Sequence, residues 1–78
     1  MNIRLTLKNN VRKRRLAVGI SQAQLAKDIG VSINTVSSIE NEKMCASAYL
    51  AAMLCRALDC RFEDLFYFVE EDKSEFDV

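Results

Sequence analysis

The six residues from Ile33 to Ser38 include side chains that can read the edges of DNA bases. Asn34 can donate and accept hydrogen bonds in a bidentate pair with adenine, and Ile33 can contact the methyl group of thymine. Ser37 and Ser38 can reach a base edge or a phosphate. Asn and Ser are poor helix formers, so helix propensity alone does not account for them. The alternative interpretation is that they are ordinary small polar residues of a solvated surface.

A second group of residues could bind the phosphates of a nucleic-acid backbone. Gln22 follows Ser21 at the expected start of a helix, where free N–H groups and the positive end of the helix dipole attract anions. Ser21 also suits the N-cap of that helix, with Gln24 completing a capping box, and the two roles are compatible. The other candidates for backbone contacts are Thr35, Asn41, Lys43, Arg12 and Arg14.

Two short helices joined by a tight turn are expected to position these side chains. Apolar residues recur at helical spacing over residues 22–29. Gly30 follows, where the end of a helix requires a residue that tolerates positive φ. Ser32 can cap a second helix with Val36 and Ile39 on its inward face, so the polar residues described above face outward. This helix-turn-helix arrangement places its second helix in the major groove of DNA.

Residues spread over 11–66 carry a resemblance to a known family. They are Val11, Arg15, Gly19, Ser21, Gln22, Leu25, Ala26, Gly30, Val31, Ser32, Val36, Ile39, Glu40, Asn41, Leu58 and Leu65. Through them the chain resembles the lambda-repressor-like helix-turn-helix domain of the Cro and XRE type. The resemblance implies a fold of five helices that binds duplex DNA. It also implies that Gln22 binds a phosphate and approaches the end base pair of the site, and that Arg15 and Glu40 form a partly buried ion pair.

Two positions depart from the family pattern. Glu42 stands where the family often has Gly, and Ala46 where it often has Pro. Glu42 adds a negative charge near the expected path of the phosphates, and the residues around Ala46 give a loop poor in cations. Both features favour modest affinity for DNA, or contacts made mainly through Gln22 and the first helix.

Length and charge fit one small domain over residues 1–69, followed by an acidic tail over 70–78. The chain has 78 residues and a net charge of zero. Residues 1–43 carry eight basic and three acidic groups, a balance of +5, whereas residues 44–78 carry three and eight, a balance of −5. A basic half that contains the helix pair suits a phosphate backbone. The alternative is ordinary solvated surface.

The two ends of the domain have strand character. Residues 2–6 alternate polar and apolar side chains, and residues 66–69 have β propensity. They either pair as a small antiparallel ribbon, with residues 3–5 beside 67–69, or the first helix starts earlier with Thr6 as its cap. The expected fold class is therefore all-α with five helices, and the terminal β-ribbon is an open alternative.

A helix expected over residues 47–58 is apolar on more than one face, with Ala48, Ala52, Cys55 and Leu58 suited to the core. A helix that is hydrophobic nearly all round is buried on both sides, and a chain this small has little interior. We therefore expect a homodimer, although all these residues could instead pack within one protomer. The expected interface residues are Tyr49, Leu50, Met53, Ala57, Phe66 and Phe68.

The composition indicates a binding protein rather than an enzyme. The chain has no His, and its three Cys form no C-x-x-C pair, so we expect no catalysis, no cofactor and no metal site. It has no apolar run long enough to span a membrane and no signal peptide, so the expected location is the cytoplasm. The predicted function is a bacterial or phage transcription regulator, a repressor that binds a palindromic DNA operator as a homodimer. The alternative is an antitoxin-type or other protein-interaction module whose C-terminal segment binds a second protein.

Overall fold

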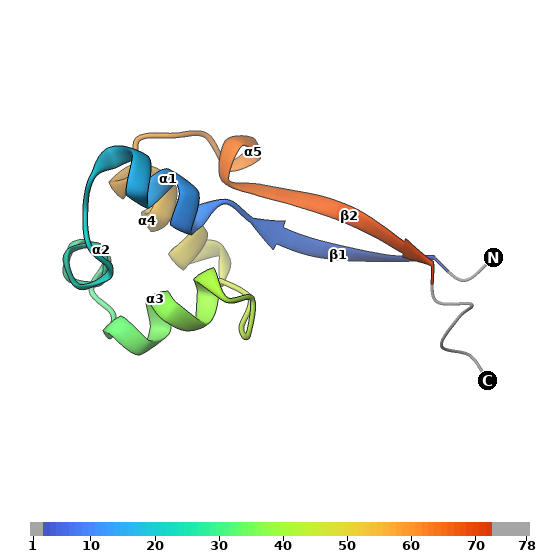
Figure 1. Ribbon diagram of the computed structural model, residues 1–78, viewed down its shortest axis with the longest axis horizontal. Helices are drawn as coiled ribbons and strands as arrows, with labels where there is room; N and C mark the ends of the chain where they lie inside the picture. Colours follow the sequence, from blue (N-terminus) through green and yellow to red (C-terminus); the bar gives the residue numbers. More distant parts are fainter. Residues whose placement is uncertain (1–2, 73–78) are drawn as a thin grey trace.

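The computed structural model describes residues 3–72, which form five helices and one two-stranded antiparallel sheet (Figure 1). The helices gather into one body, and the two strands project from it as a ribbon. An all-α description is therefore too narrow, because the ribbon is part of the fold. None of the helices in this part of the chain could cross a membrane. In chain order the elements are β1 (Ile3–Asn9), α1 (Val11–Val18), α2 (Gln22–Ile29), α3 (Ile33–Glu40), α4 (Ala48–Ala57), α5 (Phe62–Leu65) and β2 (Phe66–Asp72).

Serine caps begin three of the helices. The hydroxyls of Ser21, Ser32 and Ser47 each accept a hydrogen bond from a backbone N–H in the first turn of α2, α3 and α4. These bonds satisfy N–H groups that have no partner within the helix. The capping box expected at Ser21 is only half formed, because the Gln24 side chain donates to Asp28 Oδ1 at 2.8 Å instead of returning to the cap.

The turn between α2 and α3 depends on Gly30, which adopts a positive φ of 75°. This conformation lets the N–H of Val31 donate to the carbonyl of Ala26 at 2.9 Å, which closes the end of α2. The chain then reaches the Ser32 cap within two residues. A short turn of this kind brings α3 against α2, as the helix-turn-helix pattern predicts.

The core lies between the five helices and the first residue of β2. Leu25 on α2 and Val36 on α3 are fully buried, which agrees with the inward faces predicted from their spacing. The charged residue Arg15 is also buried. The buried apolar residues are Val11, Leu25, Ala26, Ile29, Val36, Ile39, Ala51, Leu54, Leu58, Leu65 and Phe66.

Only part of the α4 stripe expected in the core is buried there: Leu58 is fully buried, as expected, but Ala48 and Ala52 are not. Ala48 and Ala52 are exposed and Cys55 is half-buried, whereas the inward residues are spaced as i, i+3 and i+7. The stripe that is buried contains two leucines, which remove more apolar area from water than alanines do. The sequence did not distinguish the two stripes because both are apolar. The buried residues of α4 and its C-cap are Ala51, Leu54 and Leu58.

The strands are longer than predicted, and their register differs. They run over Ile3–Asn9 and Phe66–Asp72 rather than 2–6 and 66–69, with Leu7 opposite Phe68 and Ile3 opposite Asp72. The pairing of residues 3–5 with 67–69 is therefore wrong by three positions. The ribbon is anchored at its inner end, where the N–H of Asn10 donates to the carbonyl of Leu65 at 2.8 Å.

Two expectations at the chain ends need correction. The first helix does not start early with Thr6 as its cap, because Thr6 lies within β1 opposite Val69 and α1 begins at Val11. The acidic tail expected from residue 70 is partly a strand, since residues 70–72 pair with β1. Its remaining residues, 73–78, lie outside the described residues.

Candidate nucleic-acid interface

Helix α3 presents the side chains that were expected to contact bases. Ile33 and Asn34, in its first turn, are exposed. Ser37 and Ser38 are half-buried, and Ser37 Oγ accepts a hydrogen bond from Asn41 Nδ2 at 3.2 Å. The N-terminal half of α3 is therefore the accessible part. This matches the general use of recognition helices, whose N-terminal residues approach the base edges.

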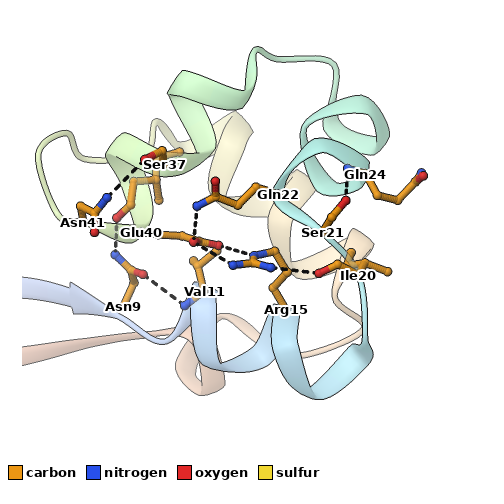
Figure 2. A network of polar contacts seen from close by, with 11 residues as sticks. Asn9, Val11, Arg15, Ile20, Ser21, Gln22, Gln24, Ser37, Glu40 and Asn41 are labelled. Atoms are coloured by element: carbon orange, nitrogen blue, oxygen red, sulfur yellow. Dashed lines mark hydrogen bonds and ion pairs between the residues drawn. The ribbon is translucent and has the colours of Figure 1, made fainter.

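A buried carboxylate joins α1, α2 and the end of α3 (Figure 2). Glu40 accepts hydrogen bonds from Arg15 Nε at 2.6 Å and from Arg15 Nη2 at 3.2 Å. Gln22 Nε2 donates to the same carboxylate at 2.9 Å. The Arg15 and Glu40 side chains are only 8 % and 1 % exposed. The two-bond geometry and the burial fix the orientation of α3 relative to α1.

Arg15 is held in its charged form by this arrangement. The hydrogen bond with Glu40 raises the pKa of the Arg15 guanidinium above its ordinary value, against the opposing effect of burial. The remaining guanidinium nitrogen, Nη1, donates to the carbonyl of Ile20 at 3.0 Å, just before α2. Arg15 therefore ties the entry of α2 to the end of α3.

The same contacts orient the Gln22 side chain. Because Nε2 donates one N–H to Glu40, the amide retains its oxygen and a second N–H for another partner. The backbone N–H groups of the first turn of α2 lie next to it, and they attract anions. The bond to Glu40 thus orders the Gln22 amide and leaves it able to bind another polar group.

An open hollow brings together several of the residues predicted to bind DNA. It contains one candidate base contact on α3 and four candidate backbone contacts from three other segments. Its floor includes the Arg15–Glu40 pair described above. The residues that line it are Arg12, Arg15, Ser21, Gln22, Ala23, Ile33, Glu40 and Asn41.

Three other residues predicted to bind the backbone lie outside this hollow. Thr35 is half-buried, and its hydroxyl lies 3.0 Å from the Ser32 hydroxyl beside the α3 cap. Lys43 is exposed in the loop after α3. Arg14 is on the other side of α1, where its guanidinium donates to the carbonyls of Leu58 and Asp59, both at 3.0 Å. These bonds engage the Arg14 guanidinium at the end of α4, away from the hollow, and do not test its assignment as a DNA contact.

The structure shows how Glu42 is accommodated at a position where the family often has Gly. Its backbone has a φ of 61°, the left-handed region that glycine adopts most readily, which accounts for Gly as the common family residue here. Its carboxylate lies 3.5 Å from Lys8 Nζ on β1. The negative charge expected near the phosphates is therefore partly balanced within the protomer.

Asn9 supports the last turn of α3, a role that was not identified from the sequence. Its Nδ2 donates to the carbonyl of Ile39 at 2.9 Å, and its Oδ1 accepts from the N–H of Val11 at 3.1 Å (Figure 2). One side chain thus links β1, the start of α1 and the last turn of α3. No motif marks this residue, because β1 was expected to end before it.

The residues expected at a dimer interface have different environments. Tyr49 and Phe68 are exposed, and Leu50, Met53 and Ala57 are partly buried against the core. Phe66 is only 5 % exposed and stacks on Phe62, with ring centroids 4.9 Å apart. Phe66 is therefore a core residue of the protomer, and little of its side chain is left for the expected dimer contact.

A family model described as helix-turn-helix matches residues 11–65 of this chain. The match begins at the first residue of α1 and ends at the last residue of α5. The chain belongs to the helix-turn-helix family. The β-ribbon lies wholly outside the matched segment.

Curated relatives in the family cover most of this chain. YgzD of Bacillus subtilis, described as an uncharacterized HTH-type transcriptional regulator, is 36% identical over 66 residues, which are 85% of this chain and 100% of YgzD. An Archaeoglobus fulgidus protein with the same description is 35% identical over 66 residues, 85% of this chain and 94% of that protein. The crystal structure of a Bacteroides fragilis protein described as DNA-binding superposes with a TM-score of 0.75 at 19% identity, covering 80% of this chain and all of that one. The last likeness concerns the fold alone.

Proposed function

We propose that this protein is a sequence-specific regulator of transcription that binds duplex DNA through α3. The observation that carries the proposal is the exposed first turn of α3 beside a hollow whose glutamine is already held by a buried ion pair. With α3 in the major groove, Ile33 and Asn34 face the base edges first. Ser37 and Ser38 contact bases further along the groove.

The backbone contacts surround α3 on both sides. Gln22 and Ser21, at the start of α2, receive one phosphate and approach the end base pair, and Arg12 supplies a cation to the same hollow. Asn41 and Lys43 follow α3 and hold the phosphates of the other strand. Thr35, beside the α3 cap, adds a hydroxyl donor. Such contacts fix the register of the protein on DNA, and the base contacts then select the sequence.

The regulator acts as a repressor and binds as a homodimer to an operator with two-fold symmetry. The relatives' description as transcriptional regulators supports a regulatory role. A second copy doubles the contacts that a domain of this size can make, and two recognition helices one DNA turn apart read matching half-sites. Occupancy of such an operator would exclude the transcription machinery.

The test begins with selection of duplexes from a random library by the purified full-length protein. Binding to the selected duplex is then measured over a salt series for wild type, Asn34→Ala and Gln22→Ala. Asn34→Ala should weaken binding to the selected site by a factor of about 5 to 150 while leaving binding to random DNA unchanged. Gln22→Ala should weaken binding to both.

Selection that yields no preferred sequence, or binding indifferent to both substitutions, would reject this function. That result would favour the alternative function, a protein-interaction module. The exposed apolar side chains of the ribbon favour that second candidate, because such side chains mark a contact surface. A neighbouring toxin gene would favour an antitoxin.

A further inference from the structure

Helix α4 ends in a turn that brings two cysteines together. The N–H of Cys60 donates to the carbonyl of Cys55 at 3.1 Å, and the N–H of Asp59 donates to the carbonyl of Arg56 at 3.3 Å. Asp59 has a φ of 50°, the left-handed conformation that this kind of turn requires. The two bonds form the Schellman motif, in which the side chains on either end of the longer bond commonly make contact. At the end of α4 these side chains are the thiols of Cys55 and Cys60.

The end of α2 shows the same motif with ordinary packing residues. There the N–H of Val31 donates to the carbonyl of Ala26 at 2.9 Å, around Gly30. Ala26 and Val31 are aliphatic, and they serve the contact by filling space. Cys55 and Cys60 also pack against the core. A pair of thiols in this position adds a reaction that a packing contact does not need.

The backbone geometry allows a disulfide between the two cysteines. Standard bond lengths on either side of the 3.1 Å hydrogen bond limit the two Cα atoms to a separation of about 7 Å. The separation is shorter than this limit, because the atoms do not lie on a straight line. Disulfides join residues whose Cα atoms are up to about 7 Å apart. The two sulfurs can therefore bond without a large backbone movement.

The two thiols differ in their surroundings. Burial raises the pKa of the Cys55 thiol above its ordinary value, and the neighbouring Cys60 thiol raises it further. Cys60 lines an open hollow of about 420 Å³ between α1 and the start of α5, and Cys55 does not. Cys60 is therefore the sulfur that an incoming reagent meets first, and Cys55 lies behind it.

The charges around the hollow indicate the kind of reagent that it accepts. Positive side chains outnumber negative ones there by three to two, and cations attract carboxylate groups. One of them, Lys13, is exposed on α1. The charged residues that line the hollow are Lys13, Arg14, Arg61, Asp59 and Asp64.

We propose that Cys55 and Cys60 form a reversible disulfide by exchange with a small disulfide that carries carboxylate groups. Cys60, as the thiolate, attacks one sulfur of the reagent, whose S–S bond breaks, and the first small thiol leaves with the proton that Cys60 has lost. Cys55 then attacks the Cys60 sulfur of this mixed disulfide, and the second small thiol leaves with the proton of Cys55. The protein loses two hydrogens and two electrons, and the reagent gains them.

This site is independent of the proposed function. It lies at the end of α4, outside the hollow beside α3, and it shares no lining residue with that hollow. Disulfides that form transiently in reducing compartments are usually catalytic or redox-sensing. The pair therefore gives this chain a reaction with the small-thiol pool that DNA binding does not require.

Treatment of the native full-length protein with oxidised glutathione tests the inference. Free thiols are trapped by alkylation, and the products are mapped by peptide mass spectrometry. We expect a Cys55–Cys60 disulfide as the main product, whereas Cys45, which is exposed, carries glutathione or an alkyl group. A native protein in which Cys45 reacts while Cys55 and Cys60 remain free would overturn the proposal. This mapping uses the wild-type chain, so it does not depend on the folding of any variant.

A comparison of folded and unfolded protein tests whether the turn brings the thiols together. Cys45→Ser removes the third thiol, and the ratio of Cys55–Cys60 disulfide to mixed disulfide is measured at a fixed glutathione concentration. Unfolding in urea should lower this ratio by about tenfold or more, because the second step loses its high effective concentration. Equal ratios in the two states would show that the fold contributes nothing.

The order of attack and the charge of the reagent are tested by rate measurements. Cys55→Ser should retain glutathione on Cys60, whereas Cys60→Ser should slow the modification of Cys55 by about tenfold. Lys13→Gln should slow the reaction of Cys60 with oxidised glutathione but not with the uncharged 2-hydroxyethyl disulfide. Lys27→Gln, on α2, is the matched control and should change neither rate. Faster reaction at Cys55 than at Cys60 would contradict the assigned order, and equal effects of Lys13→Gln on both reagents would contradict the assigned reagent.

Discussion

At the residue scale, the Glu40 carboxylate accepts three hydrogen bonds, two from Arg15 and one from Gln22. Removing it leaves the Arg15 guanidinium buried without its partner, which typically costs about 3–5 kcal/mol. Glu40→Ala should therefore destabilise the fold by an amount close to the whole stability of a small domain. The double variant Arg15→Met with Glu40→Leu should lose less than Glu40→Ala alone. Urea denaturation monitored by circular dichroism measures both, and a double variant less stable than the single one would contradict this account.

Substitution of two neighbouring cations on α1 can distinguish a DNA contact from an ordinary surface charge. Arg12 lines the hollow beside Gln22, whereas Lys13 lies with Arg14 on the other side of the helix. Arg12→Ala should weaken binding to all sequences alike and reduce the salt slope of the affinity by about 0.9, the value for one phosphate contact. Lys13→Ala should leave the slope unchanged. Fluorescence anisotropy over a salt series makes the comparison, and equal slopes for the two variants would exclude the assignment.

The relative positions of residues within the helix-turn-helix motif could be predicted from the sequence. Ser21, Gln22 and Ile33 are fixed in register by the helix pair, and the hollow brings them together. The hydrogen bonds of Arg14 and Asn9 could not be predicted, for a common reason. Their partners are carbonyl groups of distant segments, and any residue type supplies a carbonyl, so nothing in the sequence marks them.

At the element scale, Arg14 binds the carbonyls of the α4 C-cap, Leu58, and of Asp59 after it. Two hydrogen bonds from a charged donor are lost in Arg14→Met, which keeps the aliphatic packing. We expect a loss of about 1.5–3 kcal/mol in stability and no change in the DNA affinity of the folded protein. Thermal unfolding measures the first and DNA titration the second, with Lys13→Met as the control. Lowered affinity at unchanged stability would return Arg14 to the DNA interface.

The Arg4–Glu71 pair makes the outer ribbon sensitive to acid. The hydrogen bond from Arg4 is the largest cause that holds the pKa of Glu71 below its ordinary value. Because the folded pKa is lowered, the pair stabilises the ribbon above the unfolded pKa. That contribution is lost as the pH falls through the folded pKa. An NMR titration of the Glu71 carboxyl should show a midpoint that rises in Arg4→Met, and identical midpoints would exclude the interaction.

The helices could be predicted from the sequence because their signals are local. Serine caps and Gly30 lie within a few residues of the bonds they make. The face of α4 that is buried could not be predicted, since two apolar stripes compete and packing against other helices decides between them. The strand register depends on pairs nearly seventy residues apart, and alternation of side chains alone does not fix it.

At the scale of the whole molecule, the ribbon lies outside the segment that defines the family domain. The family match covers residues 11–65, and β1 and β2 flank it on either side. Asn9 and the Lys8–Glu42 pair connect the ribbon to the end of α3 and the loop that follows. A change in the ribbon would therefore reach α3 through these two contacts.

The register of the ribbon has a consequence for the order in which the chain folds. Ile3 pairs with Asp72, so the ribbon contains the contacts most distant in sequence, whereas the turns that close α2 and α3 join residues only a few positions apart. Contacts between distant residues form slowly, because a long loop must close before they gain any stabilisation. We therefore expect the turns that close α2 and α3 to form before the strands pair. In that order the chain would form the start of its α3 surface before its ribbon.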